Sequence, residues 1–237
     1  MRGRSFKLLS SEGTQQGDCC GPIFFSVTLQ QLLRVCCPAS PDGWARFYLD
    51  DGHLCGKTSF VQGMFDNLVL KSTEIGLQVN LSKCKRGSPT PSPTSALPYI
   101  PWDSGVKVLG VPIGSGSFTK GEYTKKLEKL QQGLQRLKHL GCSFSAFHIL
   151  RSCLSACKVM FLLRTLPYDL AETLAEQAQS MILSSFNEVF DVILESTQRA
   201  LTRLLVRQGG LGILDPRNVA VPAHVASFLS SSGGAAS

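Results

Sequence analysis

Two adjacent carboxylates, Asp50 and Asp51, are the residues of this chain best suited to chemistry. They follow the strand-forming run 46–49 and precede Gly52, and an apolar run resumes at Leu54. Because Asp-Asp-Gly favours a turn, we expect a β-hairpin with both aspartates at its tip. In a flat strand neighbouring side chains point to opposite faces, whereas at a turn both carboxylates can approach one metal pair. Metal-dependent phosphoryl transfer needs oxygen ligands in this arrangement, and a solvated polar turn is the plain alternative.

Four further blocks accompany the hairpin. They are Gly-Thr-Gln-Gln-Gly-Asp-Cys-Cys-Gly-Pro at 13–22, Gly-Leu-Gln-Val-Asn-Leu-Ser-Lys-Cys at 76–84, Val-Leu-Gly-Val-Pro-Ile-Gly at 108–114 and Gln-Gly-Gly-Leu-Gly-Ile at 208–213. With these blocks the sequence resembles the reverse transcriptases of non-LTR retrotransposons. In that family a Gln-Gly-Asp-Pro-type loop, a Tyr-x-Asp-Asp hairpin, a Gly-Leu-x-x-Asn-x-x-Lys segment, a Leu-Gly hairpin and a Gly-Gly-Leu-Gly region follow one another. The resemblance spans nearly the whole chain.

The resemblance implies RNA-directed DNA polymerase activity, in which two Mg²⁺ (or Mn²⁺) ions assist nucleotidyl transfer onto a primer 3′ hydroxyl. It implies metal binding by Asp50 and Asp51 and a catalytic role near the triphosphate for Lys83. It also implies primer grip by Leu109 and Gly110. The residues that it places in contact with nucleotide or template are Gln15, Gln16, Gly17, Asp18 and Tyr48. The implied partners are an RNA template with its DNA primer and deoxynucleoside triphosphates. Each block also has a plain reading: a loop before a helix N-terminus, a surface lysine, an edge hairpin.

The chain departs from the family in two places. In the family a strand with another metal-binding aspartate precedes the Gln-Gly loop, whereas here only a short predicted strand, residues 6–10, stands before it. Cys19 and Cys20 replace the usual proline dipeptide, which removes a rigid backbone angle. We therefore expect a palm without its front, followed by a thumb, and no polymerase activity in the isolated chain. The alternative is a non-catalytic nucleic-acid-binding remnant of a retroelement.

The composition is that of a globular, basic chain. Hydrophobic residues make up 43% and charged residues 17%, and the net charge is +7. That charge suits a polyanionic partner. The nine cysteines show no zinc-type spacing, so we expect reduced thiols, with Cys153 and Cys157 as small core residues. We see no signal peptide and no apolar run of the ~18 residues that a membrane span needs, so we expect an intracellular protein, nuclear or cytoplasmic, without a membrane partner.

The predicted fold class is α+β, and three regions position these residues. Residues 1–118 form a partial fingers and palm region, in which helices at 23–35 and 60–75 accompany antiparallel strands. In the first helix Phe24, Leu29, Leu32 and Leu33 are available for burial. The proline-rich stretch 86–104 is predicted to be a loop or linker. Residues 119–208 form a helical thumb, and 209–237 form a C-terminal segment.

The predicted thumb begins with a helix from Lys120 to Leu140, because leucines recur at spacings of three and four along it. Lys125, Lys126 and Lys129 lie off that stripe and are the candidate nucleic-acid contacts. A second helix is expected from Ser143, as its cap, to about Thr165, and a third is expected to be capped by Asp169. An ordinary helical bundle with a solvated charged face is the plain reading of this region.

Overall fold

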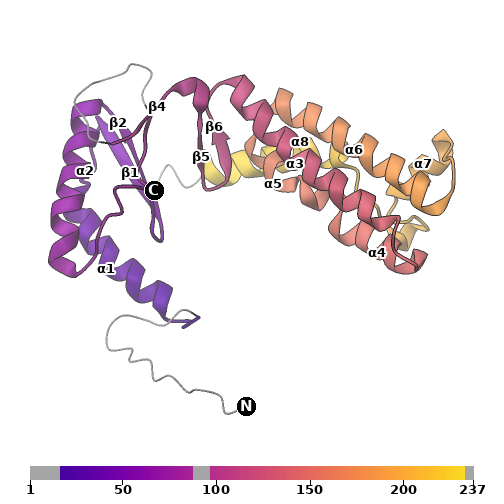
Figure 1. Cartoon of the computed structure of the whole chain (residues 1–237), viewed down its shortest axis with the longest axis horizontal. Coiled ribbons are helices and arrows are strands. Elements are labelled where there is room, and N and C mark those ends of the chain that lie inside the picture. Colours follow the sequence, from indigo (N-terminus) through magenta and orange to yellow (C-terminus); the bar gives the residue numbers. More distant parts are fainter. Residues whose placement is uncertain (1–16, 88–96, 233–237) are drawn as a thin grey trace, which may run out of the picture. The chain divides into compact units, whose positions relative to one another are not determined.

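The computed structural model describes residues 17–87 and 97–232 (Figure 1). This part of the chain has a mostly helical α+β fold with eight α-helices and three two-stranded sheets. The chain divides into two compact units, Met1–Cys84 and Lys85–Ser237. The boundaries predicted after residues 118 and 208 rest on the resemblance and stay predictions. The predicted strand at 6–10, together with Gln15 and Gln16, lies outside the described residues. Within the described ranges, no helix is both long and apolar enough to cross a membrane.

The first unit consists of two helices and one hairpin. Its elements are α1 (Gly21–Cys36), β1 (Gly43–Tyr48), β2 (Asp51–Gly56) and α2 (Thr58–Ser72), with a 3₁₀ turn at Thr73–Ile75. Helices α1 and α2 pack together, and α2 also contacts β2 (Figure 1). Gly76 adopts a left-handed conformation with φ 75°, which ends this helical segment as the sequence predicts.

The core of the first unit lies between α1, α2 and the hairpin. Leu29 and Leu32 of α1 are buried there together with Cys36 and Leu68. Phe24, in contrast, is 61% exposed, so the expectation of its burial was wrong. It lies on the face of α1 away from this small core, which one turn of leucines already fills.

The aspartate hairpin forms as predicted, but its turn lies one residue earlier than the Asp-Asp-Gly signature suggests. Strand β1 pairs antiparallel with β2, and Tyr48 lies opposite Asp51. The two-residue loop therefore consists of Leu49 and Asp50, while Asp51 already begins β2. Leu49 has a positive φ of 53°, as in a type II′ turn, which usually places glycine at this position.

The second unit begins with four short strands. Strands β3 (Arg86–Gly87) and β4 (Tyr99–Ile100) pair in parallel, and a 3₁₀ turn follows at Trp102–Ser104. Strands β5 (Val106–Val108) and β6 (Val111–Ile113) then form an antiparallel hairpin. The predicted loop at 86–104 thus has ordered elements at both ends, and its residues 88–96 lie outside the described part.

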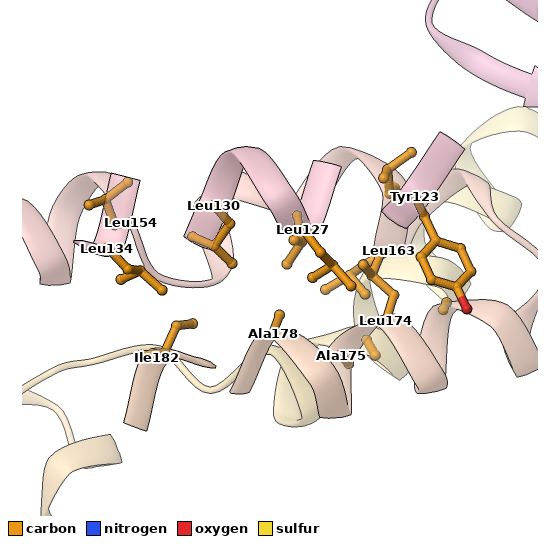
Figure 2. Close-up of a cluster of buried hydrophobic side chains, with 14 of the residues drawn as sticks. Tyr123, Leu127, Leu130, Leu134, Leu154, Leu163, Leu174, Ala175, Ala178 and Ile182 are labelled. Atoms are coloured by element: carbon orange, nitrogen blue, oxygen red, sulfur yellow. The ribbon is translucent and has the colours of Figure 1, made fainter. Parts of the chain in front are cut away.

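Six helices follow, and all but one of them contribute buried residues to one hydrophobic core. They are α3 (Gly116–Leu137), α4 (Ser143–Cys153), α5 (Met160–Thr165), α6 (Tyr168–Phe190), α7 (Ser196–Arg203) and α8 (Pro216–Ser232). The exception is α7. Helix α6 packs against α3 and α8, and α8 also packs against α5. Figure 2 shows Tyr123, Leu127, Leu130 and Leu134 of α3 facing Ala175, Ala178 and Ile182 of α6. The predicted leucine stripe is therefore the core face of α3.

The helix boundaries of this unit differ from the predicted ones. Helix α3 begins earlier, at Gly116, because the Ser115 hydroxyl accepts a hydrogen bond from the Phe118 N–H, and it ends at Leu137. Leu140 is consequently exposed. Helix α6 begins at Tyr168 with Pro167 as its N-cap, so Asp169 lies inside the first turn, where a negative charge still stabilises the helix.

The single helix predicted from Ser143 to about Thr165 is also wrong. Helix α4 ends at Cys153, and the chain bends so that Leu154, Ala156 and Val159 all enter the core. Gly133 of α3 makes room for Leu154, since a Cβ at Gly133 would lie 2.9 Å from a Leu154 methyl carbon. Cys153 and Cys157 are both exposed in consequence, contrary to their expected core role.

The Gly-Gly-Leu-Gly segment folds back onto the end of α7. A Cβ at Gly210 would lie 2.2 Å from the Leu204 carbonyl oxygen, so this approach requires glycine. The Gly212 N–H donates to the Leu204 carbonyl at 2.9 Å, and Ile213 is then buried in the core. Asp215, whose side chain is fully buried, accepts hydrogen bonds from Arg217 at the start of α8. The motif therefore has a structural role, because it positions the chain so that α8 packs in the bundle.

Candidate functional site

The aspartate hairpin has one covered and one open face. Ala45 and Phe47 are half-buried, and Phe47 packs against the core formed by α1 and α2. Tyr48 points to the other face and is 66% exposed, and its cross-strand partner Asp51 is exposed as well. Asp50 is exposed in the turn. Helices α1 and α2 therefore cover one face of the hairpin and leave both carboxylates accessible from the other.

Two positions of the hairpin restrict which residues can occupy them. Leu49 keeps a left-handed backbone that costs a residue with a side chain about 1–2 kcal/mol. Such strain is most often found at functional sites, where the surrounding structure maintains it. Gly52 lies under Phe47, because a Cβ there would be 2.2 Å from the ring. The glycine of Asp-Asp-Gly thus serves the packing of Phe47 and not the turn itself.

The donor set of the hairpin suits a hard divalent cation. Carboxylate oxygens are the ligands that Mg²⁺ prefers, and Mg²⁺ is commonly held by one or two carboxylates together with waters and substrate phosphates. Asp50 and Asp51 meet that minimum. Among the described residues, no third carboxylate, histidine or cysteine joins them in a cluster of metal-binding geometry.

A groove lies between α1 and the hairpin, with a volume of ≈ 440 Å³. Its lining includes Arg34 of α1, Arg46 of β1 and Leu49 of the turn. Two guanidinium groups beside a hairpin with two carboxylates suit a ligand that contains phosphate, because arginine recognises phosphate oxygens in a planar, bidentate manner. These arginines could not be predicted from sequence patterns, since they come from different elements.

The loop before α1 is described from Gly17 onward. Gly17 has a φ of 96°, which favours glycine. The Asp18 carboxylate accepts a hydrogen bond from the Cys20 N–H at 2.9 Å, and Cys20 is the N-cap residue of α1. Lys83 lies in a turn in which its N–H donates to the Asn80 carbonyl, and its side chain is exposed. No ion pair joins Lys83 to Asp50 or Asp51 in the part of the chain that the structure describes.

Leu109 and Gly110, the predicted primer grip, form the turn of the β5–β6 hairpin in the second unit. Both have positive φ, 49° and 86°, as in a type I′ turn. Leu109 is half exposed, and a Cβ at Gly110 would lie 3.5 Å from the Phe161 ring of α5. The predicted hairpin is therefore present, and its tip lies beside an exposed aromatic ring.

The predicted nucleic-acid contacts on α3 are all exposed, but they are not equivalent. Lys125 and Lys129 are one turn apart, and Arg136 continues the same face seven residues further on. Lys126 lies about 100° around the helix from Lys125. Arg136 was not among the predicted nucleic-acid contacts, although its spacing from Lys129 places it on this face.

Glu122 lies beside this row and ties α3 to strand β5. Its carboxylate binds Lys107 of β5 and also Lys125, the latter at 2.7 Å. Lys107, and then Lys125, lower the pKa of Glu122 through their hydrogen bonds. In the described residues, Lys129 and Arg136 form no ion pair, so their charges stay available to a partner.

No protein-family model matches this sequence, and the searches of curated proteins and of solved structures gave no significant match.

Proposed function

We propose that this chain is a unit of an RNA-directed DNA polymerase of the non-LTR retrotransposon type, with part of the palm in its first unit and a thumb in its second. Asp50 and Asp51 are its metal ligands. The basic face of α3 (Lys125, Lys129 and Arg136) is its contact with the backbone of a template–primer duplex. This proposal rests on the resemblance of the motifs and on the geometry of the hairpin.

The observation that supports it most is the pair of accessible carboxylates at a strained two-residue turn. The hairpin is held by α1 and α2 on one face only, and Leu49 keeps an unfavourable φ at the turn. Strained backbone is enriched at functional sites, and two adjacent carboxylates repel each other. A divalent cation offsets that repulsion, because it binds both carboxylates.

Each residue then has a role that its position allows. Asp50 and Asp51 hold Mg²⁺, which when bound steadies the charge of the reacting phosphates. Arg34 and Arg46, in the groove beside the turn, bind phosphate oxygens of the incoming nucleotide. Leu109 and Gly110 contact the primer, and Lys129 and Arg136 bind backbone phosphates without reading sequence. Gly17, Asp18, Tyr48 and Lys83 keep their proposed contacts with nucleotide and template.

A specific observation favours a second candidate, a nucleic-acid-binding protein without catalytic activity. The described residues contain no cluster of three possible metal ligands that includes Asp50 or Asp51, whereas a two-metal site needs ligands for two ions. We expect no incorporation by the isolated chain under either candidate, so primer extension by this chain joined to the aspartate-bearing strand of a related reverse transcriptase separates the two. Template-dependent incorporation that requires Asp50 supports the polymerase, and duplex binding without incorporation supports the second candidate.

Both candidates require nucleic-acid binding, which fluorescence anisotropy measures directly. We expect a labelled RNA–DNA primer–template to bind with little dependence on its sequence. The affinity should fall steeply between about 50 and 200 mM salt, because bound phosphates release counterions. Absence of salt-sensitive binding would reject both candidates.

A further inference from the structure

Asp18, Cys19 and Cys20 place three metal-binding atoms together at the start of α1. One carboxylate oxygen and both thiol sulfurs lie within 4.8 Å of one another, and all three side chains are exposed. Within the described residues, this is the one set of three such side chains with this geometry. The fold uses neither thiol in a core or in a disulfide.

The distance between the two sulfur atoms fits a tetrahedral metal ion. A Zn–S bond is about 2.3 Å long, which places two sulfur ligands of one tetrahedral ion about 3.8 Å apart. The Cys19 and Cys20 sulfurs are 3.9 Å apart. The sulfur–sulfur distance therefore matches the one that two ligands of a single tetrahedral ion require. This distance also far exceeds the length of a disulfide bond.

The Asp18 carboxylate is held at the same place. One of its oxygens accepts a hydrogen bond from the Cys20 N–H at 2.9 Å, which fixes the carboxylate beside the thiols. Its other oxygen remains available to an ion. The exposure of all three groups leaves a fourth coordination position open to solvent.

The second vicinal cysteine pair of the chain shows the contrasting, structural case. Cys36 is 1% exposed and belongs to the core of the first unit. Burial raises the pKa of Cys37 to about 11, which disfavours the thiolate form that metals bind. The two pairs of adjacent cysteines thus lie in different environments, and only Cys19 and Cys20 combine accessibility with a neighbouring carboxylate.

We propose that Asp18, Cys19 and Cys20 form a binding site for a thiophilic divalent cation of the Zn²⁺ and Cd²⁺ class, with an open fourth position. Binding exchanges the two thiol protons for the metal ion and releases them to solvent. Thiolate ligands select this class over Mg²⁺, so the site is chemically distinct from the aspartate hairpin. The inference does not depend on the proposed polymerase function.

Titration of the reduced full-length chain with Cd²⁺ tests this site, because Cd–thiolate bonds absorb in the ultraviolet. We expect one tight equivalent in the wild type and at least a tenfold loss of affinity in the double variant Cys19→Ser/Cys20→Ser. The control Cys153→Ser/Cys157→Ser removes two other exposed thiols and should bind as the wild type does. Asp18→Asn should weaken binding severalfold.

A second measurement needs no variant. Saturating Zn²⁺ should protect Cys19 and Cys20 of the wild-type chain from alkylation by iodoacetamide, as peptide mass spectrometry reports, while Cys142 and Cys153 react as before. The proposal fails if the serine double variant keeps the tight Cd²⁺ equivalent, if Asp18→Asn binds like the wild type, or if Zn²⁺ leaves the alkylation of Cys19 and Cys20 unchanged.

Discussion

Gly52 determines how the side chains of the aspartate hairpin are arranged, although it has no side chain of its own. The Phe47 ring occupies the space where a Cβ would lie, 2.2 Å away, and this lets Phe47 join the core beneath the hairpin. If the ring were displaced, β1 would lose its anchor on α1 and α2. The carboxylates next to Gly52 would then lose their fixed position.

Replacing Gly52 by alanine should therefore destabilise the protein. We expect Gly52→Ala to lower the free energy of unfolding by about 1–3 kcal/mol, the usual cost of overpacking. Gly63→Ala is the matched control, because a Cβ at Gly63 in α2 meets nothing within 4 Å. That control should gain up to about 1 kcal/mol of helix propensity. Urea unfolding measures both, and an equal stability of the two variants would contradict this account of Gly52.

Sequence patterns predict the hairpin but not the exact position of its turn. Turn propensity favours Asp-Asp-Gly, whereas the register places Leu49 and Asp50 in the loop. The deciding contact, Phe47 over Gly52, joins residues on two strands and is not a property of any local pattern. The Asp18–Cys19–Cys20 cluster was equally hidden, because only three-dimensional distances show that the adjacent thiols share one side.

At the scale of elements, α3 contacts helix α6 and strand β5 through different kinds of interaction. Its leucine face packs on α6, while Glu122 on its other side binds Lys107 of strand β5. This ion pair fixes the β5–β6 hairpin to the start of the helix. The hairpin that is the proposed primer grip and the helix that is the proposed duplex contact are thus joined by one carboxylate.

The contribution of Glu122 should depend on pH in a defined direction. Its pKa is lowered in the folded protein from an ordinary value of 4.5, so folding favours the charged form. The stabilisation is complete above that ordinary value and is lost as the pH falls through the lowered pKa. We expect wild type to be more stable than Glu122→Gln at neutral pH and the difference to shrink as the pH falls below the ordinary value of 4.5 and through the lowered pKa.

Thermal unfolding across that pH range measures the effect. Glu128→Gln is the matched control, since Glu128 lies on the same helix and forms no ion pair in the described residues. It should show no comparable change in its difference from wild type. If Glu122→Gln has the same thermal stability as the wild type at every pH, the ion pair between β5 and α3 does not stabilise the protein.

The basic face of α3 should contribute to duplex affinity more than basic residues elsewhere in the second unit. We expect Lys129→Gln/Arg136→Gln to weaken primer–template binding and to reduce the slope of log affinity against log salt by up to about 2, because two phosphate contacts are lost. Lys120→Gln/Lys158→Gln removes the same charge from exposed lysines that lie off this face, one on the opposite side of α3 and one after α4. Anisotropy titrations should show a smaller change for this control. An equal change in both variants would mean that net charge, and not this face, governs binding.

Helices α1, α2, α3 and α6 were predictable in existence but not in all their limits, whereas α5, α7 and α8 were not predicted as separate helices. The spacing of Leu127, Leu130 and Leu134 identifies α3 and its buried face, because packing follows periodicity. The break after Cys153 could not be predicted, since its cause is the space that Gly133 leaves for Leu154 on a different helix. Such contacts between distant segments decide where a helix ends when no proline or glycine does.

At the scale of the whole molecule, the hairpin proposed to bind metal belongs to one compact unit and the basic face of α3 to the other. The net charge of +7 favours a polyanion for the chain as a whole but does not say where it binds. What distinguishes the proposed function from general attraction to nucleic acid is one requirement. A bound duplex must lie against the cation held by Asp50 and Asp51.

Localised cleavage by bound Fe²⁺ tests that requirement in one experiment on the intact chain. Fe²⁺ binds carboxylate oxygens, and with ascorbate and peroxide it generates hydroxyl radicals that cut protein and nucleic acid only near the ion. We predict cuts in the chain around residues 48–53 and cuts in the bound primer–template concentrated near the primer 3′ end. Excess Mg²⁺ should suppress both sets of cuts. Asp50→Asn/Asp51→Asn should abolish both while duplex affinity stays within about twofold. Cuts spread evenly along the duplex, or cuts that persist unchanged in the double variant, would contradict the account.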